Sequence, residues 1–183
     1  MSAEMKAIVA VSILIFLLLG CAQPTIEDGD QNIRLPAVSD EIQLDRDLEI
    51  LSDNTRVFFQ RGEVVAKKDL DHYHPSCDLE VRTLSPEVQH VEKDSFTVTR
   101  VIFSQESVVV RHGVRLAGFG WGGGLWTEGG QSIYRFIRMQ LHSVVQPDVL
   151  RLTCRGAYED YHRASYPSPV EIRIALGGFI SFP

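Results

Sequence analysis

The sequence predicts an all-β domain, mainly antiparallel, that forms a compact barrel or sandwich with one short C-terminal helix. Three observations lead to this fold class. β-Branched residues gather in short runs, polar and apolar residues alternate within several of these runs, and turn-forming residues separate them. The chain has 183 residues, of which 44% are hydrophobic, which suffices for one folded domain. We place this domain at residues 37–183.

The first half of the domain is predicted to contain a tight hairpin and an alternating strand. Arg61-Gly62 separates residues 56–60 from residues 63–67, as expected for a short hairpin turn. Residues 77–84 alternate between apolar and polar side chains, which is typical of a half-buried strand. We expect the apolar side to face the core; it consists of Cys77, Leu79 and Val81. We expect the polar side to face solvent; it consists of Asp78, Glu80 and Arg82.

Two further strand pairs are predicted in the second half. The first turns at Gln105-Glu106, between residues 95–104 and residues 107–112, which are rich in β-branched side chains. The second joins residues 133–145 to residues 149–155. By contrast, the stretch that begins at Ser39 fits the periodicity of a strand and of a helix, and both interpretations stay open.

A short helix is predicted near the C-terminus. Ser168-Pro169-Val170-Glu171 has a capping serine, a proline at the first helical position and a glutamate at the third, and Gly177-Gly178 ends the segment. Apolar residues also alternate here as in a strand, but the cap and the stop favour the helix. Residues 179–182 are a candidate last strand.

The N-terminal segment has the pattern of an export signal. Residues 1–6 carry a lysine and the free amine, and residues 7–19 are apolar without a charge. This matches a secretory signal and is shorter than the ~20 apolar residues of a spanning helix. The segment ends in Leu18-Leu19-Gly20-Cys21, which resembles the lipobox of bacterial lipoproteins. An uncleaved anchor and an ordinary signal peptide are the alternative interpretations.

The resemblance implies an address and an anchor. In bacterial lipoproteins the signal peptide, here residues 1–20, is removed, and the cysteine, here Cys21, carries a diacylglycerol and an acyl chain such as palmitate. Ala22 stands where an aspartate commonly retains Gram-negative lipoproteins in the inner membrane, so the resemblance implies the outer membrane, with the domain facing the periplasm. Residues 21–36 are polar and acidic, and we expect them to form a flexible tether.

The remaining cysteines are expected to pair. If Cys21 is lipidated, Cys77 and Cys154 are left in an oxidising compartment, where two cysteines favour a disulfide. Both fall on the apolar faces of predicted strands.

Composition and motifs argue against nucleic-acid and nucleotide binding but do not indicate a particular function. A formal net charge of −6 gives no electrostatic basis for binding nucleic acid. The glycine-rich residues 117–132 contain Gly118-x-Gly120-x-x-Gly123, but this motif opens no visible helix, so nucleotide binding is not expected. Trp121 and Trp126 in this stretch are candidates for contact with a partner protein or membrane, or else pack on the domain.

One possible metal site and two carboxylate pairs are the candidates for chemistry. His72 and His74 have the spacing of two ligands on one side of an extended segment, which suits zinc or copper. A disulfide at Cys77 competes with this site, since an oxidised cysteine supplies no thiolate. Glu159-Asp160 and the pair Asp69 and Asp71 have the chemistry for acid–base work on a glycan, but surface carboxylates usually only solvate a face.

The sequence therefore predicts a lipid-anchored envelope protein with a structural or partner-binding role. It is similar to small lipoproteins of Gram-negative bacteria, held to the membrane by its lipid anchor and expected to contact another envelope component. A metal-binding periplasmic lipoprotein is the main alternative, and a glycan-acting envelope enzyme is the weaker one. No cofactor is expected beyond the covalent lipid on Cys21.

Overall fold

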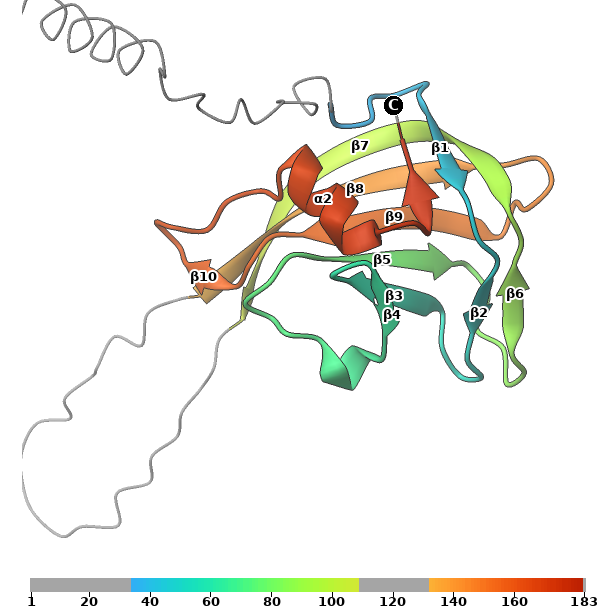
Figure 1. The fold of residues 1–183 in the computed structure, drawn as a ribbon, viewed down its shortest axis with the longest axis horizontal. Coiled ribbons are helices and arrows are strands. Elements are labelled where there is room, and N and C mark those ends of the chain that lie inside the picture. Colours follow the sequence, from blue (N-terminus) through green and yellow to red (C-terminus); the bar gives the residue numbers. More distant parts are fainter. Residues whose placement is uncertain (1–33, 109–131, 183) are drawn as a thin grey trace, which may run out of the picture. The chain divides into compact units, whose positions relative to one another are not determined.

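The computed structural model describes residues 34–108 and 132–182, and these ranges are built mainly from antiparallel strands (Figure 1). The all-β prediction is confirmed. Within the described ranges, nine strands form one sheet in the order β11-β1-β7-β8-β9-β5-β3-β4, with β10 beside β8, and β2 pairs with β6 in a second sheet. The elements are β1 (Glu41–Leu44), β2 (Leu48–Ile50), β3 (Arg56–Gln60), β4 (Glu63–Val65), η1 (Lys67–Asp69), β5 (Ser76–Val81), β6 (Gln89–Val91), β7 (Asp94–Val108), β8 (Ser132–His142), β9 (Val149–Arg155), β10 (Glu159–Asp160), α2 (Pro169–Leu176) and β11 (Ile180–Ser181).

The large sheet curls into a half-barrel that encloses the core. In Figure 1, β1 and β11 fold over the same side of β7, β8, β9 and β5 that α2 covers. The helix packs on β5 and β3 and contributes Ile172 and Leu176 to the core. The largest fully buried side chains include Phe59, Phe96, Leu79, Ile137, Met139 and Leu152. Burial of such side chains supplies most of the driving force for folding.

The hairpin and the helix predicted from the sequence are both present, and they meet at two glycines. Arg61 and Gly62 turn between β3 and β4 with positive φ angles of 55° and 80°, as a tight primed turn requires. At the end of α2, Gly177 has a φ of 57°. A Cβ atom on Gly177 would lie 2.5 Å from the Cα atom of Gly62. Glycine at Gly177 therefore permits both the backbone angle and the close approach.

The caps of α2 follow the predicted pattern. The Ser168 side chain accepts a hydrogen bond from the backbone N–H of Glu171, and the Glu171 carboxylate accepts one from the backbone N–H of Ser168. Gly177 then ends the helix, and its N–H donates to the carbonyl of Arg173. The stretch that was open in the sequence forms two strands, β1 and β2, because its buried residues follow period two; they are Ile42, Leu44, Leu48 and Ile50.

The predicted hairpin at Gln105-Glu106 is wrong. Both residues continue β7, where Gln105 pairs with Arg135 and Glu106 with Tyr134. The strand runs unbroken for 15 residues because β8 offers a partner in register along most of that length. A polar dipeptide between β-branched runs does not break a strand when its neighbour supplies the hydrogen bonds. Residues 109–112 of the predicted second run lie outside the described residues.

Among the described residues, no helix has the length and apolar character that crossing a membrane would require.

Candidate functional site

The predicted Cys77–Cys154 disulfide is present, and it links the middle of the sheet. Cys77 on β5 and Cys154 on β9 are directly opposed in register, with Cα atoms 4.0 Å apart and a sequence separation of 77 residues. Both are buried on the core side, at 1% and 0% exposure. Each neighbour of these cysteines along the strand therefore points to the opposite face of the sheet.

That opposite face carries most of the charged side chains of the sheet, and we call it the polar face. It is the face that α2 does not cover. Antiparallel register places one row of its side chains across five strands, namely Arg100, Gln140, Arg151, Glu80 and Arg56. The adjacent row consists of Ile102, Arg138, Thr153, Asp78 and Phe58, and the next contains Ser104, Phe136, Arg155 and Ser76.

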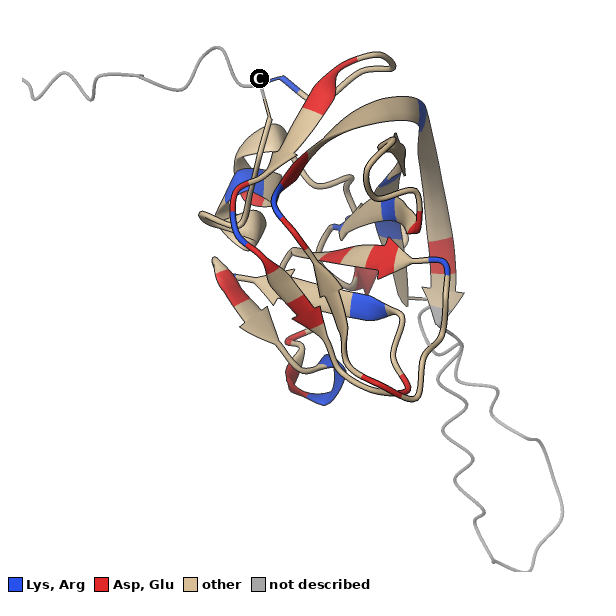
Figure 2. Ribbon diagram, turned by 90° about the vertical axis from the view of Figure 1, so that its right-hand side faces the viewer, with Lys and Arg blue, Asp and Glu red and all other residues tan. Residues whose placement is uncertain are grey.

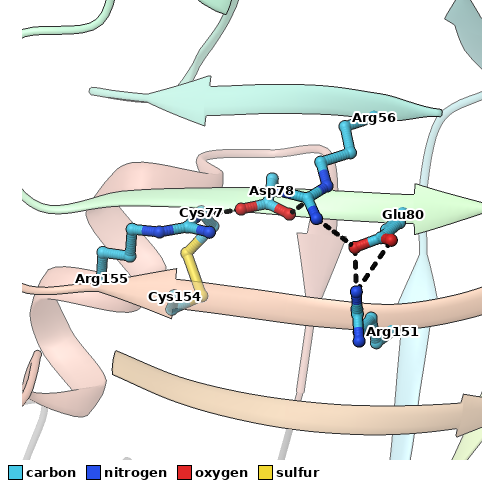
Figure 3. A network of polar contacts seen from close by, with 7 residues as sticks. All are labelled: Arg56, Cys77, Asp78, Glu80, Arg151, Cys154 and Arg155. Carbon is cyan, nitrogen blue, oxygen red and sulfur yellow. Dashed lines mark hydrogen bonds and ion pairs between the residues drawn. A yellow bond between two sulfur atoms is a disulfide. The ribbon is translucent and has the colours of Figure 1, made fainter. Parts of the chain in front are cut away.

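The expectation that Asp78 and Glu80 face solvent is wrong. Asp78 is 0% exposed and Glu80 is 9% exposed. They do lie opposite the apolar side of β5, as the alternation predicted. Arginines from β3 and β9, however, cover them (Figure 3). Buried carboxylates are stable only when paired and hydrogen-bonded, and these two are.

Asp78 lies between two guanidinium groups. Arg155 Nη1 donates a hydrogen bond to Asp78 Oδ1, and Arg56 Nε is 3.7 Å from Asp78 Oδ2 (Figure 3). Oδ2 is buried and has no hydrogen-bond partner among the described residues. The two arginine side chains remain 21% and 34% exposed, so the pair reaches from the buried carboxylate to the surface.

Glu80 extends this chain of ion pairs to a third arginine. Arg151 binds it with two parallel hydrogen bonds, Nε to Oε2 at 2.7 Å and Nη2 to Oε1 at 2.8 Å. Arg56 Nη2 is 2.9 Å from the same Oε2. Burial alone would raise the pKa of Glu80, but the hydrogen bonds and charges of Arg151 and Arg56 outweigh it and hold that pKa below its usual range. Glu80 is therefore ionised at neutral pH.

Arg138 has no such counter-ion among the described residues. Its guanidinium lies over the ring of Phe136, with Cζ 4.9 Å from the ring centre, and its buried Nε has no hydrogen-bond partner in the described part of the chain. Burial lowers the pKa of Arg138, and repulsion from Arg151 and Arg155 lowers it further, while attraction to Glu80 and Asp78 offsets part of this. Arg151 and Arg155 therefore lie near enough on the adjacent strand β9 to repel the charge of Arg138.

One end of the polar face is hollowed into a pocket of about 290 Å³. Gln60 holds the loop at residues 71–74, which forms part of the pocket wall. Its side-chain amide donates hydrogen bonds to the carbonyls of Asp71 and His74, and its Oε1 accepts one from the backbone N–H of Asp71. The lining residues are Arg56, Phe58, Lys67, Leu70, His72, His74, Ser76, Glu106, Tyr134 and Arg155.

The two histidines predicted as metal ligands line this same pocket. His72 makes an edge contact with the ring of Tyr134, and His74 Nε2 lies 3.5 Å from Asp71 Oδ2. Cys77 cannot join them, since its side chain points to the other face and is oxidised. No group of three or more His, Cys, Asp or Glu residues suited to a metal ion occurs in the described ranges.

Tyr134 lines the same pocket and packs against a tyrosine outside it. Tyr134 contacts Tyr158 with ring centres 4.8 Å apart. Burial, with smaller effects from Tyr158 and Glu106, raises the pKa of Tyr134 to about 12. The phenol is therefore neutral at physiological pH and able to donate a hydrogen bond.

The other predicted site residues fall outside this arrangement. Glu159 and Asp160 line a separate open pocket of about 420 Å³ together with Tyr73, Ser132, Tyr158 and Arg163. Trp121, Trp126 and Cys21 lie outside the described residues. The segment 109–131, which contains both tryptophans, connects β7 to β8 at the paired residues Val108 and Ser132. Glu106 and Tyr134, the next pair on that side, line the pocket.

The arginines of the polar face were missed from the sequence. The available signal was that Arg151 and Arg155 share a side of their strand, opposite Leu152 and Cys154, just as Asp78 lies opposite Cys77. Pairing the two cysteines would have brought these opposite charges together. No protein-family model, curated protein or solved structure matches the chain, so its site is described from its own residues alone.

Proposed function

We propose that the chain is a lipid-anchored envelope protein whose β-domain binds another envelope component. The observation that carries the anchor is Leu18-Leu19-Gly20-Cys21 after an apolar stretch. In this proposal Cys21 carries a diacylglycerol and an acyl chain, which together hold the chain stably where a single chain would not. The outer membrane is the proposed location, with the domain in the periplasm.

The polar face and its pocket are the proposed binding surface. They combine guanidinium groups, a neutral phenol and aromatic rings in one hollow of about 290 Å³. Such a mixture of apolar walls and a few fixed polar groups is typical of binding sites. Trp121 and Trp126 belong to the segment that leaves and re-enters the sheet beside this pocket, and we assign them a supporting contact with the partner.

The anchor is tested by replacing the acceptor thiol. We expect Cys21→Ser to accumulate as unprocessed precursor without lipid, measured by metabolic labelling with a radioactive or clickable fatty acid. Gly20→Ala, which keeps a small residue before the cysteine, is the matched control and should be labelled like the wild type. Normal labelling of Cys21→Ser would refute the anchor.

The partner is tested by crosslinking in intact cells followed by purification of the tagged chain. We expect a specific crosslinked component that decreases when Trp121 and Trp126 are both replaced by Ala. The thermal melting temperature should be unchanged in that variant. A large loss of stability would show that the tryptophans pack on the domain and would overturn their role in contact.

Metal binding is a second candidate, because His72 and His74 line the same pocket with Asp71 close to His74. Elemental analysis of protein purified without chelators tests it. Zinc or copper at one ion per chain, lost in His72→Ala with His74→Ala, would support a metal site. Wild-type protein without stoichiometric metal would reject it.

A further inference from the structure

Charge is divided unequally over the domain. Residues 41–54 and 87–94 contain eight acidic and two basic side chains, and this excess equals the net charge of −6 of the whole chain. They build β1, β2 and β6 and the start of β7, the side that Figure 2 turns toward the viewer. The rest of the chain has a formal net charge of zero. Any cluster of positive charge there therefore reflects where the charged residues lie in the fold and not an excess of basic residues.

The polar face has such an excess. In the rows described above and at the pair Glu106 and Tyr134, five arginines, at positions 56, 100, 138, 151 and 155, face three carboxylates, Asp78, Glu80 and Glu106. The carboxylates of Glu41, Glu63 and Asp160 share this side of the sheet but belong to the other strands β1, β4 and β10. Asp78 and Glu80 are each shared between two arginines. Within these rows the arginines therefore exceed the carboxylates by two.

Arg138 is where this excess is concentrated. It is partly exposed, its Nε has no partner among the described residues, and its neighbours across the sheet include Arg151 and Arg155. Arg151 and Arg155 are paired with Glu80 and Asp78, whereas Arg138 forms no ion pair within the described residues. Its guanidinium contacts the ring of Phe136, and no carboxylate or carbonyl acceptor for it is found in the described residues.

We propose that the polar face binds a phosphate group, with Arg138 as its main contact and Arg151 and Arg155 on either side. A phosphate monoester carries a charge of about −1.5 to −2 and three strong acceptor oxygens, which suits the unpaired charge of Arg138 and the arginines on the neighbouring strand. A guanidinium binds such an oxyanion through two parallel hydrogen bonds. A carboxylate offers fewer acceptors and half the charge.

The existing ion pairs orient this site in advance. Glu80 occupies Nε and Nη2 of Arg151, and Asp78 holds Nη1 of Arg155, so both guanidinium groups are fixed. No partner for their remaining N–H groups is found among the described residues, and these groups can face a ligand. Phe136 supports the plane of Arg138. Less side-chain freedom is then lost on binding than for exposed arginines.

A phosphate ligand would specify what the binding surface of the proposed envelope protein recognises. The phosphate site depends on that proposed function only for the location of the domain in the cell envelope. The phosphate has two possible sources, a lipid headgroup or a soluble phosphate compound, and the chemistry of recognition is common to both.

Titration calorimetry of the full-length chain in detergent, in a buffer free of phosphate, tests the site with inorganic phosphate. We expect saturable binding that Arg138→Gln weakens about tenfold, the effect of losing one charge-assisted pair. Arg138→Lys should lie in between, since it keeps the charge but not the planar fork. Arg82→Gln removes the same charge from an exposed position beyond the end of β5 and should bind like the wild type.

Several results would overturn the proposal. These are wild-type protein that binds no phosphate, acetate that binds as tightly as phosphate, and equal affinity in Arg138→Gln and wild type. An equal loss in Arg82→Gln would show only a general charge effect and would also reject the site. Melting temperatures of the variants verify that each is folded.

A second titration distinguishes the two sources with a short-chain phosphatidic acid. Binding at least about tenfold tighter than inorganic phosphate, and dependent on Arg138, would identify a lipid headgroup. Equal affinity would identify a soluble phosphate compound. Failure of these titrations leaves lipid labelling of Cys21 unaffected, and failure of labelling leaves phosphate binding unaffected, so the two proposals are tested separately.

Discussion

Asp78 follows Cys77 along β5, so the buried carboxylate and the disulfide lie on opposite faces of one strand. β5 sits between β3 and β9 within the sheet. On one side the disulfide joins it to β9, and on the other the carboxylate joins it to arginines of both neighbours. A covalent and an ionic link thus fix the same strand from two directions.

Loss of the Asp78 carboxylate should destabilise the domain. Asp78→Ala would leave Arg56 and Arg155 without the anion between them, and we expect a loss of about 2 kcal/mol in the free energy of unfolding. Urea denaturation followed by circular dichroism measures it. Asp45→Ala, at an exposed position, is the control and should change stability by less than about 0.5 kcal/mol. Equal stability of the two variants would contradict a role of Asp78 in holding the sheet.

Removal of the disulfide should have a larger effect. The bond closes a loop of 77 residues, and the chain-entropy model gives a loss of about 4 kcal/mol when Cys77 and Cys154 are both replaced by Ala. Urea denaturation with and without reductant measures it. Reductant should destabilise the wild type and leave the double variant unchanged. Alkylation of the unreduced, denatured chain at both Cys77 and Cys154 would show that the bond does not form.

Stability should fall in acid partly through Glu80. Its pKa is lower in the folded than in the unfolded chain, so its contribution is present in full above the unfolded pKa and is lost as the pH falls through the folded one. Glu80→Gln should therefore be less stable than the wild type at neutral pH, and the difference should shrink from about pH 5 downwards. Thermal melting over a pH series measures this. The exposed Glu49→Gln should follow the wild-type profile; a constant gap between Glu80→Gln and wild type at all pH values would count against the assignment.

The contact between the β3–β4 turn and α2 should tolerate no side chain at Gly177. Gly177→Ala would place a Cβ against the Gly62 backbone in a left-handed conformation, and we expect a loss of about 2 kcal/mol. The neighbouring Gly178→Ala is the control. Its Cβ would meet only the flexible end of Arg46, at 3.2 Å, so its stability should stay within about 0.5 kcal/mol of the wild type. Chemical denaturation of both variants decides the matter.

Elements with local signals were predictable from the sequence. The turn at Arg61-Gly62, the cap at Ser168 and the stop at Gly177 depend on residues close together in the chain, and all three are present. The faces of the residue 77–84 strand were also assigned correctly as far as the core side is concerned, because alternation is a local property.

The polar face could not be predicted in the same way. Burial of Asp78 depends on Arg155, which is 77 residues away and meets it only once β5 and β9 pair. The continuation of β7 through Gln105-Glu106 likewise depends on β8 as a partner. Alternation shows that a strand has two different faces, but not whether the polar one meets water or side chains from another strand.

The disulfide also determines how the domain would respond to mechanical load. Tension applied between residue 34 and the C-terminus passes from Cys77 to Cys154 through the sulfur bridge and bypasses the chain between them. The 77 residues of sequence separation correspond to roughly 250 Å of contour length that cannot be drawn out while the bridge is intact. Arg56, Lys67, His72 and His74, which line the pocket, precede the bridge and are on the load path, whereas Asp78, Arg138 and Arg151 are shielded from it. A pulled domain would therefore lose one wall of its pocket before it released the strands that carry Arg138.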